Sequence, residues 1–177
     1  MTITHSKPAL LGFIGRSGAG KTSIITDVIE CLRIDGFTVS AIKRAHEGFD
    51  LDQPGKDSWR LREAGCREVM LVGDQRWALL HEYGDEPEPD PRALGQRMGE
   101  VDIVLFEGFR GAPIPMIEVY RPTLGLPMLW PAFPSVVALA TDGDVDCPLP
   151  VLDLRAPQTV ADFLIERLEL ARSLLKR

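Results

Sequence analysis

The chain has 177 residues, of which 45% are hydrophobic and 26% charged, and 20 Lys and Arg against 26 Asp and Glu leave a net charge of −6. This composition is that of a globular protein long enough for one domain with a hydrophobic core. The acidic balance argues against a nucleic-acid binder or an anionic-membrane binder, because both need a surplus of positive charge on one face. Any polyanion that binds here must be held by a local arrangement of residues.

The cysteines and the apolar runs of the sequence indicate in which cellular compartment the protein folds. None of the three cysteines has the CxxC spacing of a zinc site or suggests a disulfide framework. The apolar run near the N-terminus lacks a signal-peptide cleavage pattern, and the uncharged stretch between Arg121 and Asp142 is interrupted by prolines. We therefore expect a cytoplasmic protein without a membrane span.

The first elements alternate between strand and helix. Ala9–Ile14 is a short apolar run before a glycine-bearing loop, as expected of a buried parallel strand. Apolar residues then recur at helical spacing between 25 and 32, and Gly36 suits the position after a helix end. Strand composition returns at Phe37–Lys43, which completes a strand, helix, strand unit of the right-handed parallel kind.

The same alternation continues to the C-terminus. A broad apolar stripe after residue 157 predicts a final helix packed on the sheet. We therefore expect an α/β fold with a mainly parallel twisted sheet and some antiparallel strands, in one domain spanning 1–177. In chain order, the pattern predicts a polar loop over 44–56, a short helix from Asp57 to Gly65, a hairpin over 67–72 and 76–83, a helix from Pro91 to Gly99, and strands over 101–106, 116–120, 136–140 and 151–154.

A phosphate-binding motif lies between the first predicted strand and the first predicted helix. The segment Gly15-Arg16-Ser17-Gly18-Ala19-Gly20-Lys21-Thr22 matches G-x-x-x-x-G-K-[ST]. Glycines let successive backbone N–H groups converge on phosphate oxygens, and the helix N-terminus adds its positive dipole end. Lys21 is placed to reach the β- and γ-phosphates and Thr22 to ligate Mg²⁺. The motif predicts a three-layer P-loop NTPase-like fold.

Carboxylates near the ends of neighbouring strands are candidates for the metal. Glu107 ends the apolar strand VDIVLF, where a carboxylate would serve Mg²⁺ or its water, whereas Asp102 at the other end reads as structural. Asp50, Asp52 and Asp57 lie in or just after the loop that follows the second strand. Asp57 suits either the metal or the N-cap of its helix, and the sequence leaves both roles open.

Base selection is assigned to the end of the strand over 136–140. The segment Thr141-Asp142-Gly143-Asp144 resembles the [NT]-K-x-D guanine motif with aspartate in place of lysine. An aspartate there can accept hydrogen bonds from guanine N1 and N2. Asp142 and Asp144 are both candidates, and a plain turn is the alternative.

Several separated stretches resemble one family, the molybdopterin-guanine dinucleotide biosynthesis adaptor proteins, the B proteins of that pathway. The most specific are PGKDSWR (54–60) and FEGFR (106–110), beside the P-loop and the segment VVALATDGD. The resemblance implies a cytoplasmic homodimer that binds GTP and Mg²⁺, has at most slow GTPase activity, and assists the guanylyltransferase that attaches GMP to molybdopterin. It leaves open whether molybdopterin itself is a ligand.

The resemblance also assigns residues. It implies that 15–22 bind the triphosphate, that Thr22, Asp57 and Glu107 serve magnesium, with Lys21, Asp57 and Glu107 as the candidate catalytic residues, and that Thr141 and Asp142 contact the base. The chain departs from the family pattern at Arg110 and Met116, where the family commonly has lysine. The rival function is a small-molecule kinase or ligase of the dethiobiotin synthetase type that uses ATP.

The proline-rich apolar stretch Leu124–Phe133 has two interpretations. Its leucines, Trp130 and Phe133 either bury in the core or form a contact surface for a second copy. If the second holds, Trp130→Ala weakens self-association.

Overall fold

The computed structural model describes residues 7–45 and 52–174, with side chains to residue 168. It divides into two compact units: unit 1 comprises Met1–Arg44 with Asp90–Arg177, and unit 2 is Ala45–Pro89. The expectation of one nucleotide-binding domain over 1–177 stays a prediction.

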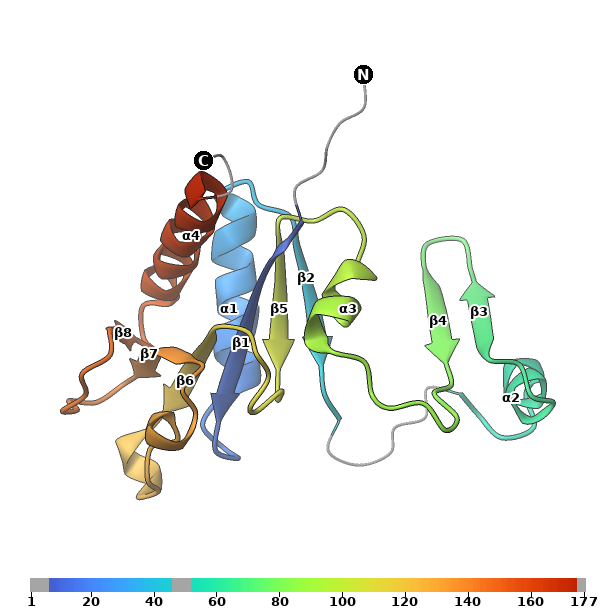
Figure 1. Ribbon diagram of the computed structural model, residues 1–177, viewed down its shortest axis with the longest axis horizontal. Helices are drawn as coiled ribbons and strands as arrows, with labels where there is room; N and C mark the ends of the chain where they lie inside the picture. Colours follow the sequence, from blue (N-terminus) through green and yellow to red (C-terminus); the bar gives the residue numbers. More distant parts are fainter. Residues whose placement is uncertain (1–6, 46–51, 175–177) are drawn as a thin grey trace. The chain divides into compact units, whose positions relative to one another are not determined.

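Unit 1 is built on a six-stranded sheet with the order β2-β5-β1-β6-β7-β8, in which every neighbouring pair is parallel. Figure 1 shows α1 and α4 side by side against one face of this sheet. The bounds are β1 (Ala9–Gly15), α1 (Lys21–Ile34), β2 (Val39–Lys43), α3 (Pro91–Gln96), β5 (Ile103–Glu107), β6 (Met116–Tyr120), β7 (Val136–Thr141), β8 (Val151–Asp153) and α4 (Pro157–Leu174), with 3-10 turns η1 (Pro122–Leu124) and η2 (Trp130–Ala132).

Alternation along the strands divides the core of unit 1 into two clusters. On the α1 and α4 side, Leu11 and Phe13 of β1 pack with Leu105 of β5 and with the helices. On the other side, Phe106 and Met116 pack with Phe109 and with partly buried residues of the α3 region. Both faces of the central strands are therefore covered, as expected of a parallel sheet.

The proline-rich stretch contributes to the second cluster. Leu129 is only 5% exposed, and Trp130 and Phe133 are partly buried against the same cluster, whereas Leu124 and Leu126 are exposed. The carboxylate of Glu118, 1% exposed, accepts hydrogen bonds from the backbone N–H of Leu129 and Trp130 at 2.7 and 2.8 Å. Leu129, Trp130 and Phe133 therefore belong to the core or its edge, whereas the rest of this stretch is mostly exposed, so each of its two interpretations fits a part of it.

Unit 2 contains α2 (Asp57–Glu63) and an antiparallel hairpin of β3 (Glu68–Val72) and β4 (Trp77–His81). Asp52 stabilises the start of α2, because its carboxylate accepts hydrogen bonds from the Ser58 hydroxyl at 2.6 Å and from Arg62 Nε at 3.2 Å. The Ser58 hydrogen bond, more than the charge of Arg62, holds the pKa of Asp52 below its usual range although burial opposes this. Asp52 is thus a structural residue of unit 2.

The α/β fold with a mainly parallel sheet and a small antiparallel part is confirmed, and so is each predicted helix and strand, with shifts at the ends. The structural interpretation of Asp102 holds as well, since its carboxylate accepts from the Thr38 hydroxyl at 2.7 Å and from the Thr38 N–H at 3.0 Å. Among the described residues, no helix combines the length and the hydropathy needed to span a membrane.

Candidate functional site

The glycine-rich loop connects the end of β1 to the start of α1 (Figure 1). Gly18 and Gly20 have φ of 79° and 87°, a left-handed conformation that side chains other than glycine rarely adopt. A Cβ at Gly15 would lie 2.5 Å from the carbonyl oxygen of Val119 on the neighbouring strand β6. Glycine is therefore required at all three positions. The predicted P-loop residues 15–22 run from the last residue of β1, through a tight loop with exposed Ser17 and Gly18, into the first two residues of α1.

Cationic side chains converge on this loop. Lys21 Nζ donates to the carbonyl oxygens of Gly15 and Arg16 at 3.2 and 3.1 Å, and Arg110 Nη2 donates to Gly15 at 2.9 Å. Arg121 Nε donates to the Ala19 carbonyl at 3.0 Å. Neutral carbonyls are weaker acceptors than phosphate oxygens, so these cations are positioned to bind an anion that enters the loop.

Arg16 adds a further donor. Its Nη2 lies 3.4 Å from the Pro127 carbonyl, and its Nε is buried and has no hydrogen-bond acceptor in the described part of the chain. A buried donor without a partner is costly, and an acceptor from a bound ligand would satisfy it.

The local charge also perturbs Lys21. Burial lowers the pKa of Lys21, and the positive charges of Arg110 and Lys43 lower it further, while the Glu107 carboxylate opposes these effects. Three cationic side chains, Lys21, Arg110 and Lys43, act on one another beside a single carboxylate, Glu107, and this excess of positive charge matches the negative charge of a triphosphate.

Thr22 and Glu107 are brought together at the carboxyl end of the sheet. The Thr22 hydroxyl lies 2.9 and 3.2 Å from the two carboxylate oxygens of Glu107. Glu107 is paired in register with Lys43 of β2, whose Nζ lies 3.4 Å from Glu107 Oε1 and 3.3 Å from Thr22 Oγ1. A hydroxyl and a carboxylate are the hard oxygen donors that Mg²⁺ prefers, and a cationic group already lies against both, so these residues fit a divalent cation.

The remaining predicted metal residue, Asp57, belongs to unit 2. Asp57 is the first residue of α2 in unit 2, and no side-chain hydrogen bond caps that helix, whose N-cap is Lys56. Asp50 lies outside the described residues. In the described ranges, no three His, Cys, Asp or Glu side chains gather in a metal-binding cluster, so a metal here would need ligand oxygens as well.

The predicted base-contacting residues follow β7. Thr141 is buried and its hydroxyl accepts from the Gly143 N–H at 3.3 Å, whereas Asp144 is exposed. Asp142 forms an ion pair with Arg121, the same guanidinium that donates to Ala19 of the P-loop. One arginine therefore connects the two predicted ligand-binding segments, and a base contact at Asp142 has to share its carboxylate with Arg121.

Lys43 and Arg121 were not identified by sequence reasoning. Lys43 is the last residue of the strand next to β5, and its register with Glu107 depends on the strand order, in which β2 neighbours β5 and not β1. Arg121 follows β6, which lies next to β1. The available signal was general: polar residues at the carboxyl ends of parallel strands gather at one edge of the sheet.

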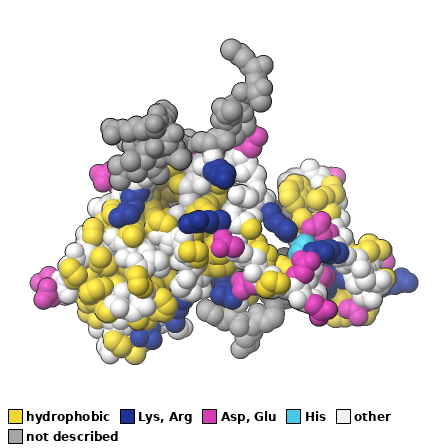
Figure 2. Space-filling model, viewed as in Figure 1, with side chains coloured by type: hydrophobic (Ala, Val, Ile, Leu, Met, Phe, Trp, Pro, Cys, Tyr) yellow, Lys and Arg dark blue, Asp and Glu magenta, His cyan; other side chains and the backbone are white. Residues whose placement is uncertain are grey.

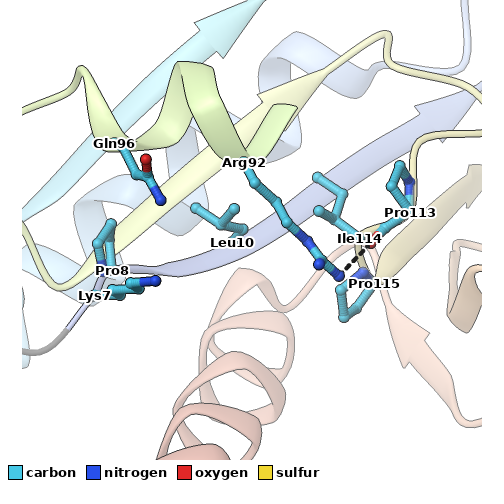
Figure 3. A pocket seen from close by; sticks show the side chains of 8 residues that line it. All are labelled: Lys7, Pro8, Leu10, Arg92, Gln96, Pro113, Ile114 and Pro115. Carbon is cyan, nitrogen blue, oxygen red and sulfur yellow. Dashed lines mark hydrogen bonds between the residues drawn. The ribbon is translucent and has the colours of Figure 1, made fainter. Parts of the chain in front are cut away.

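A separate hollow of about 350 Å³ lies near the other end of β1 (Figure 3). Its walls are mostly aliphatic and proline side chains from the start of β1 and the segment before β6, with Lys7 and, from α3, Arg92 and Gln96 around them. Arg92 Nη2 donates to the Pro113 carbonyl at 3.2 Å. None of the predicted site residues lines this hollow, so the candidate site is the cluster at the P-loop.

Known proteins are similar to this chain over most of its length. The family model described as molybdopterin guanine dinucleotide synthesis protein B matches residues 10–142. The molybdopterin-guanine dinucleotide biosynthesis adapter protein of Escherichia coli (strain K12) is 36% identical over 160 residues, which cover 89% of this chain and 91% of the relative. The protein of the same name from Haemophilus influenzae is 36% identical over 156 residues, 88% of this chain and 86% of the relative.

A solved structure is similar over the same span. The crystal structure described as molybdopterin-guanine biosynthesis protein B has a TM-score of 0.69 at 24% identity and covers 89% of this chain and 98% of its own. At this identity the likeness concerns the fold, and it agrees with the parallel sheet of unit 1 and the small antiparallel sheet of unit 2.

Proposed function

The chain belongs to the molybdopterin guanine dinucleotide synthesis protein B family, the adapter proteins of molybdopterin-guanine dinucleotide biosynthesis, and from this premise we propose that it binds GTP with Mg²⁺. In this role it assists the guanylyltransferase that attaches GMP to molybdopterin. The observation that carries the proposal is the convergence of Lys21, Arg110, Thr22 and Glu107 at one loop.

The triphosphate would lie against the loop of residues 15–22. Backbone N–H groups of this loop and the N-terminus of α1 supply donors, and Lys21, with Arg110 beside it, supplies positive charge. Mg²⁺ would be held by Thr22 and by Glu107, directly or through water, with phosphate oxygens completing its shell. Asp57, the first residue of α2 in unit 2, remains a candidate for this ion by its position in the sequence and by family resemblance.

Any GTPase activity would be slow. The groups at the site position and neutralise charge: Lys21 and Arg110 are donors, and Glu107 is engaged with the Thr22 hydroxyl and Lys43. Fast hydrolysis needs a residue that orients the attacking water and a cation that reaches the transition state. Slow turnover suits an adapter that works through a partner enzyme.

Guanine selectivity is proposed at Thr141, Asp142 and Asp144. Asp142 is half-buried beside Arg121 and lies on the segment that follows β7, next to the strand that Arg121 follows. A carboxylate accepts from guanine N1 and N2, and adenine offers no such donors at those places.

A homodimer is proposed from the surface of unit 2. Val72 and Trp77, which face each other across the hairpin, are 78% and 64% exposed, and Met70, Leu71 and Leu79 are also exposed. Figure 2 shows hydrophobic side chains gathered at the end of the hairpin. Monomeric proteins rarely expose such contiguous apolar surface, so a second copy of the chain is the proposed partner there.

The test is an equilibrium titration of the purified protein with GTP and with ATP, each with and without Mg²⁺, while phosphate release is monitored. We expect Mg²⁺-assisted GTP binding, weak ATP binding and little turnover. A preference for ATP would overturn the guanine assignment and favour the small-molecule kinase.

The adapter role needs its own measurement. Purified guanylyltransferase is supplied with molybdopterin and GTP, and the yield of the dinucleotide is measured with and without this chain. The proposal predicts a higher yield with the chain and a smaller gain with the Lys21→Ala variant. An equal yield with and without the chain would contradict the adapter role while leaving GTP binding intact.

A further inference from the structure

The side chain of Lys43 lies where the proposed magnesium would bind. Its Nζ is 3.3 Å from Thr22 Oγ1 and 3.4 Å from Glu107 Oε1, and these two oxygens are themselves 2.9 Å apart. An ammonium group thus contacts both protein oxygens proposed for the ion. The Lys43 ammonium group needs no contact with a triphosphate to stay at this position, because the Glu107 carboxylate supplies the opposite charge.

The strand register explains this placement. Lys43 pairs with Glu107 across neighbouring parallel strands, so their side chains point to the same face of the sheet. That face continues the alternation of Ile103 and Leu105, which pack against the α1 and α4 side, and Thr22 lies in the first turn of α1. Lys43 therefore reaches the Thr22–Glu107 pair because of where β2 sits in the sheet.

A magnesium ion and this ammonium group exclude each other. Mg²⁺ binds oxygen ligands at about 2.0–2.1 Å, so an ion on Thr22 Oγ1 would come close to the position of Lys43 Nζ. Two cations at such separation repel strongly. The Lys43 side chain is 63% exposed, against 14% for Glu107, so it is the lysine that has room to leave.

We propose that Lys43 is the resident counter-ion of the metal site: it neutralises Glu107 and holds the Thr22–Glu107 pair when Mg²⁺ is absent, and it is displaced when the Mg²⁺–nucleotide complex binds. This inference rests on the proposed function. Its consequence is that Lys43 weakens the dependence of GTP binding on Mg²⁺, because the lysine supplies in the metal-free protein part of the charge that the ion would supply.

The experiment compares GTP dissociation constants in excess Mg²⁺ and in EDTA, by isothermal titration calorimetry, for the wild type, Lys43→Met and Lys43→Arg. For Lys43→Met we expect the ratio of the EDTA value to the Mg²⁺ value to rise about tenfold, the effect of one charge-assisted hydrogen bond. Lys43→Arg, which keeps the charge, should retain most of the wild-type ratio. Lys7→Met is the matched control, because Lys7 lines the hollow of Figure 3 instead.

A Mg²⁺ titration of the GTP-saturated protein gives an independent reading. By linkage, the Mg²⁺ concentration at half-saturation should fall in Lys43→Met by the same factor. Thermal unfolding of each variant establishes that it is folded.

Two outcomes would overturn the inference. If Lys43→Met weakened GTP binding equally in Mg²⁺ and in EDTA, Lys43 would be an ordinary phosphate-binding lysine. If GTP binding changed in neither condition, Lys43 would have no role in nucleotide or metal binding. Failure of the proposed function is distinguishable from both, since the wild type would then bind GTP in neither condition.

Discussion

Units 1 and 2 use their hydrophobic side chains in opposite ways. In unit 1, both faces of the central strands are covered, and Phe13 and Phe106 are fully buried. In unit 2, β3 and β4 form a regular antiparallel hairpin, but Val72 and Trp77 remain largely exposed. An isolated two-stranded hairpin is at best marginally stable in water. The proposals above assign the ligand chemistry to unit 1, which has a closed core, and the contact with a second copy to unit 2, which has exposed apolar side chains.

The largest expected effect tests the core side of this comparison. Phe13→Ala should lower the free energy of unfolding by about 3–5 kcal/mol, because it removes a fully buried aromatic side chain and leaves a cavity. Trp77→Ala at low protein concentration should change it by less than about 1 kcal/mol, since Trp77 is 64% exposed. Urea unfolding measures both, and similar losses would contradict the division between the units.

The next effect concerns ligand chemistry in unit 1. Lys21→Ala should weaken GTP binding by roughly 10- to 150-fold, because it removes a charged donor from the phosphate loop. Calorimetry with GTP and Mg²⁺ measures this, and Lys7→Ala serves as the control. Unchanged GTP affinity in Lys21→Ala would contradict the assignment of the phosphate site. If Lys21→Ala also weakened self-association, ligand binding and dimer formation would not be confined to different units.

The sequence was most informative where a residue's role depends on its own neighbours in the chain. The short apolar run Ala9–Ile14 predicted the strand, and the glycines of the phosphate loop predicted the turn, because apolar runs and φ preferences are local properties. The terminal position of Glu107 on its strand likewise sufficed to bring it to Thr22, since the ends of parallel strands meet at one edge.

Roles that depend on distant partners were not predictable. Lys43 lies beside Glu107 because β2 pairs with β5, a strand that comes much later in the chain. Arg121 donates a hydrogen bond to Ala19, which is 102 positions away in the sequence. Glu118 reads as one polar residue in a strand, yet it is buried because backbone N–H groups of the proline-rich stretch satisfy it. Asp52 was a candidate for the nucleotide loop, and its hydrogen bonds with Ser58 and Arg62 show a structural role within unit 2.

A third effect tests the association side of the comparison. Trp77→Ser should weaken self-association about tenfold or more, because exposed tryptophans at interfaces commonly carry much of the binding energy. GTP affinity should stay as in the wild type. Sedimentation at several concentrations measures the dimer, and the matched control is Val151→Ser, an exposed apolar residue of unit 1 at 48% exposure. Equal weakening by both variants would move the interface away from unit 2.

The smallest effect is a pH dependence within unit 1. Protonated Lys21 binds phosphate, and its lowered pKa means that the free protein loses this charge at a lower pH than an ordinary lysine would. GTP affinity should therefore decline as pH rises, by less than about tenfold, while the pH is still below the ordinary lysine pKa of 10.5. The phosphate groups of GTP complete their own ionisation mostly below this window.

The variant Arg110→Gln sharpens this prediction, because the positive charge of Arg110 is one of the causes that lower the pKa of Lys21. Removing that charge should raise the pKa and move the decline in affinity to higher pH, while the lost guanidinium weakens GTP binding at every pH. Calorimetric titrations at a series of pH values separate the two effects, since one shifts the profile along the pH axis and the other lowers it uniformly. A decline that moves to lower pH in Arg110→Gln would mean that burial and neighbouring charge do not act on Lys21 as the geometry of unit 1 requires.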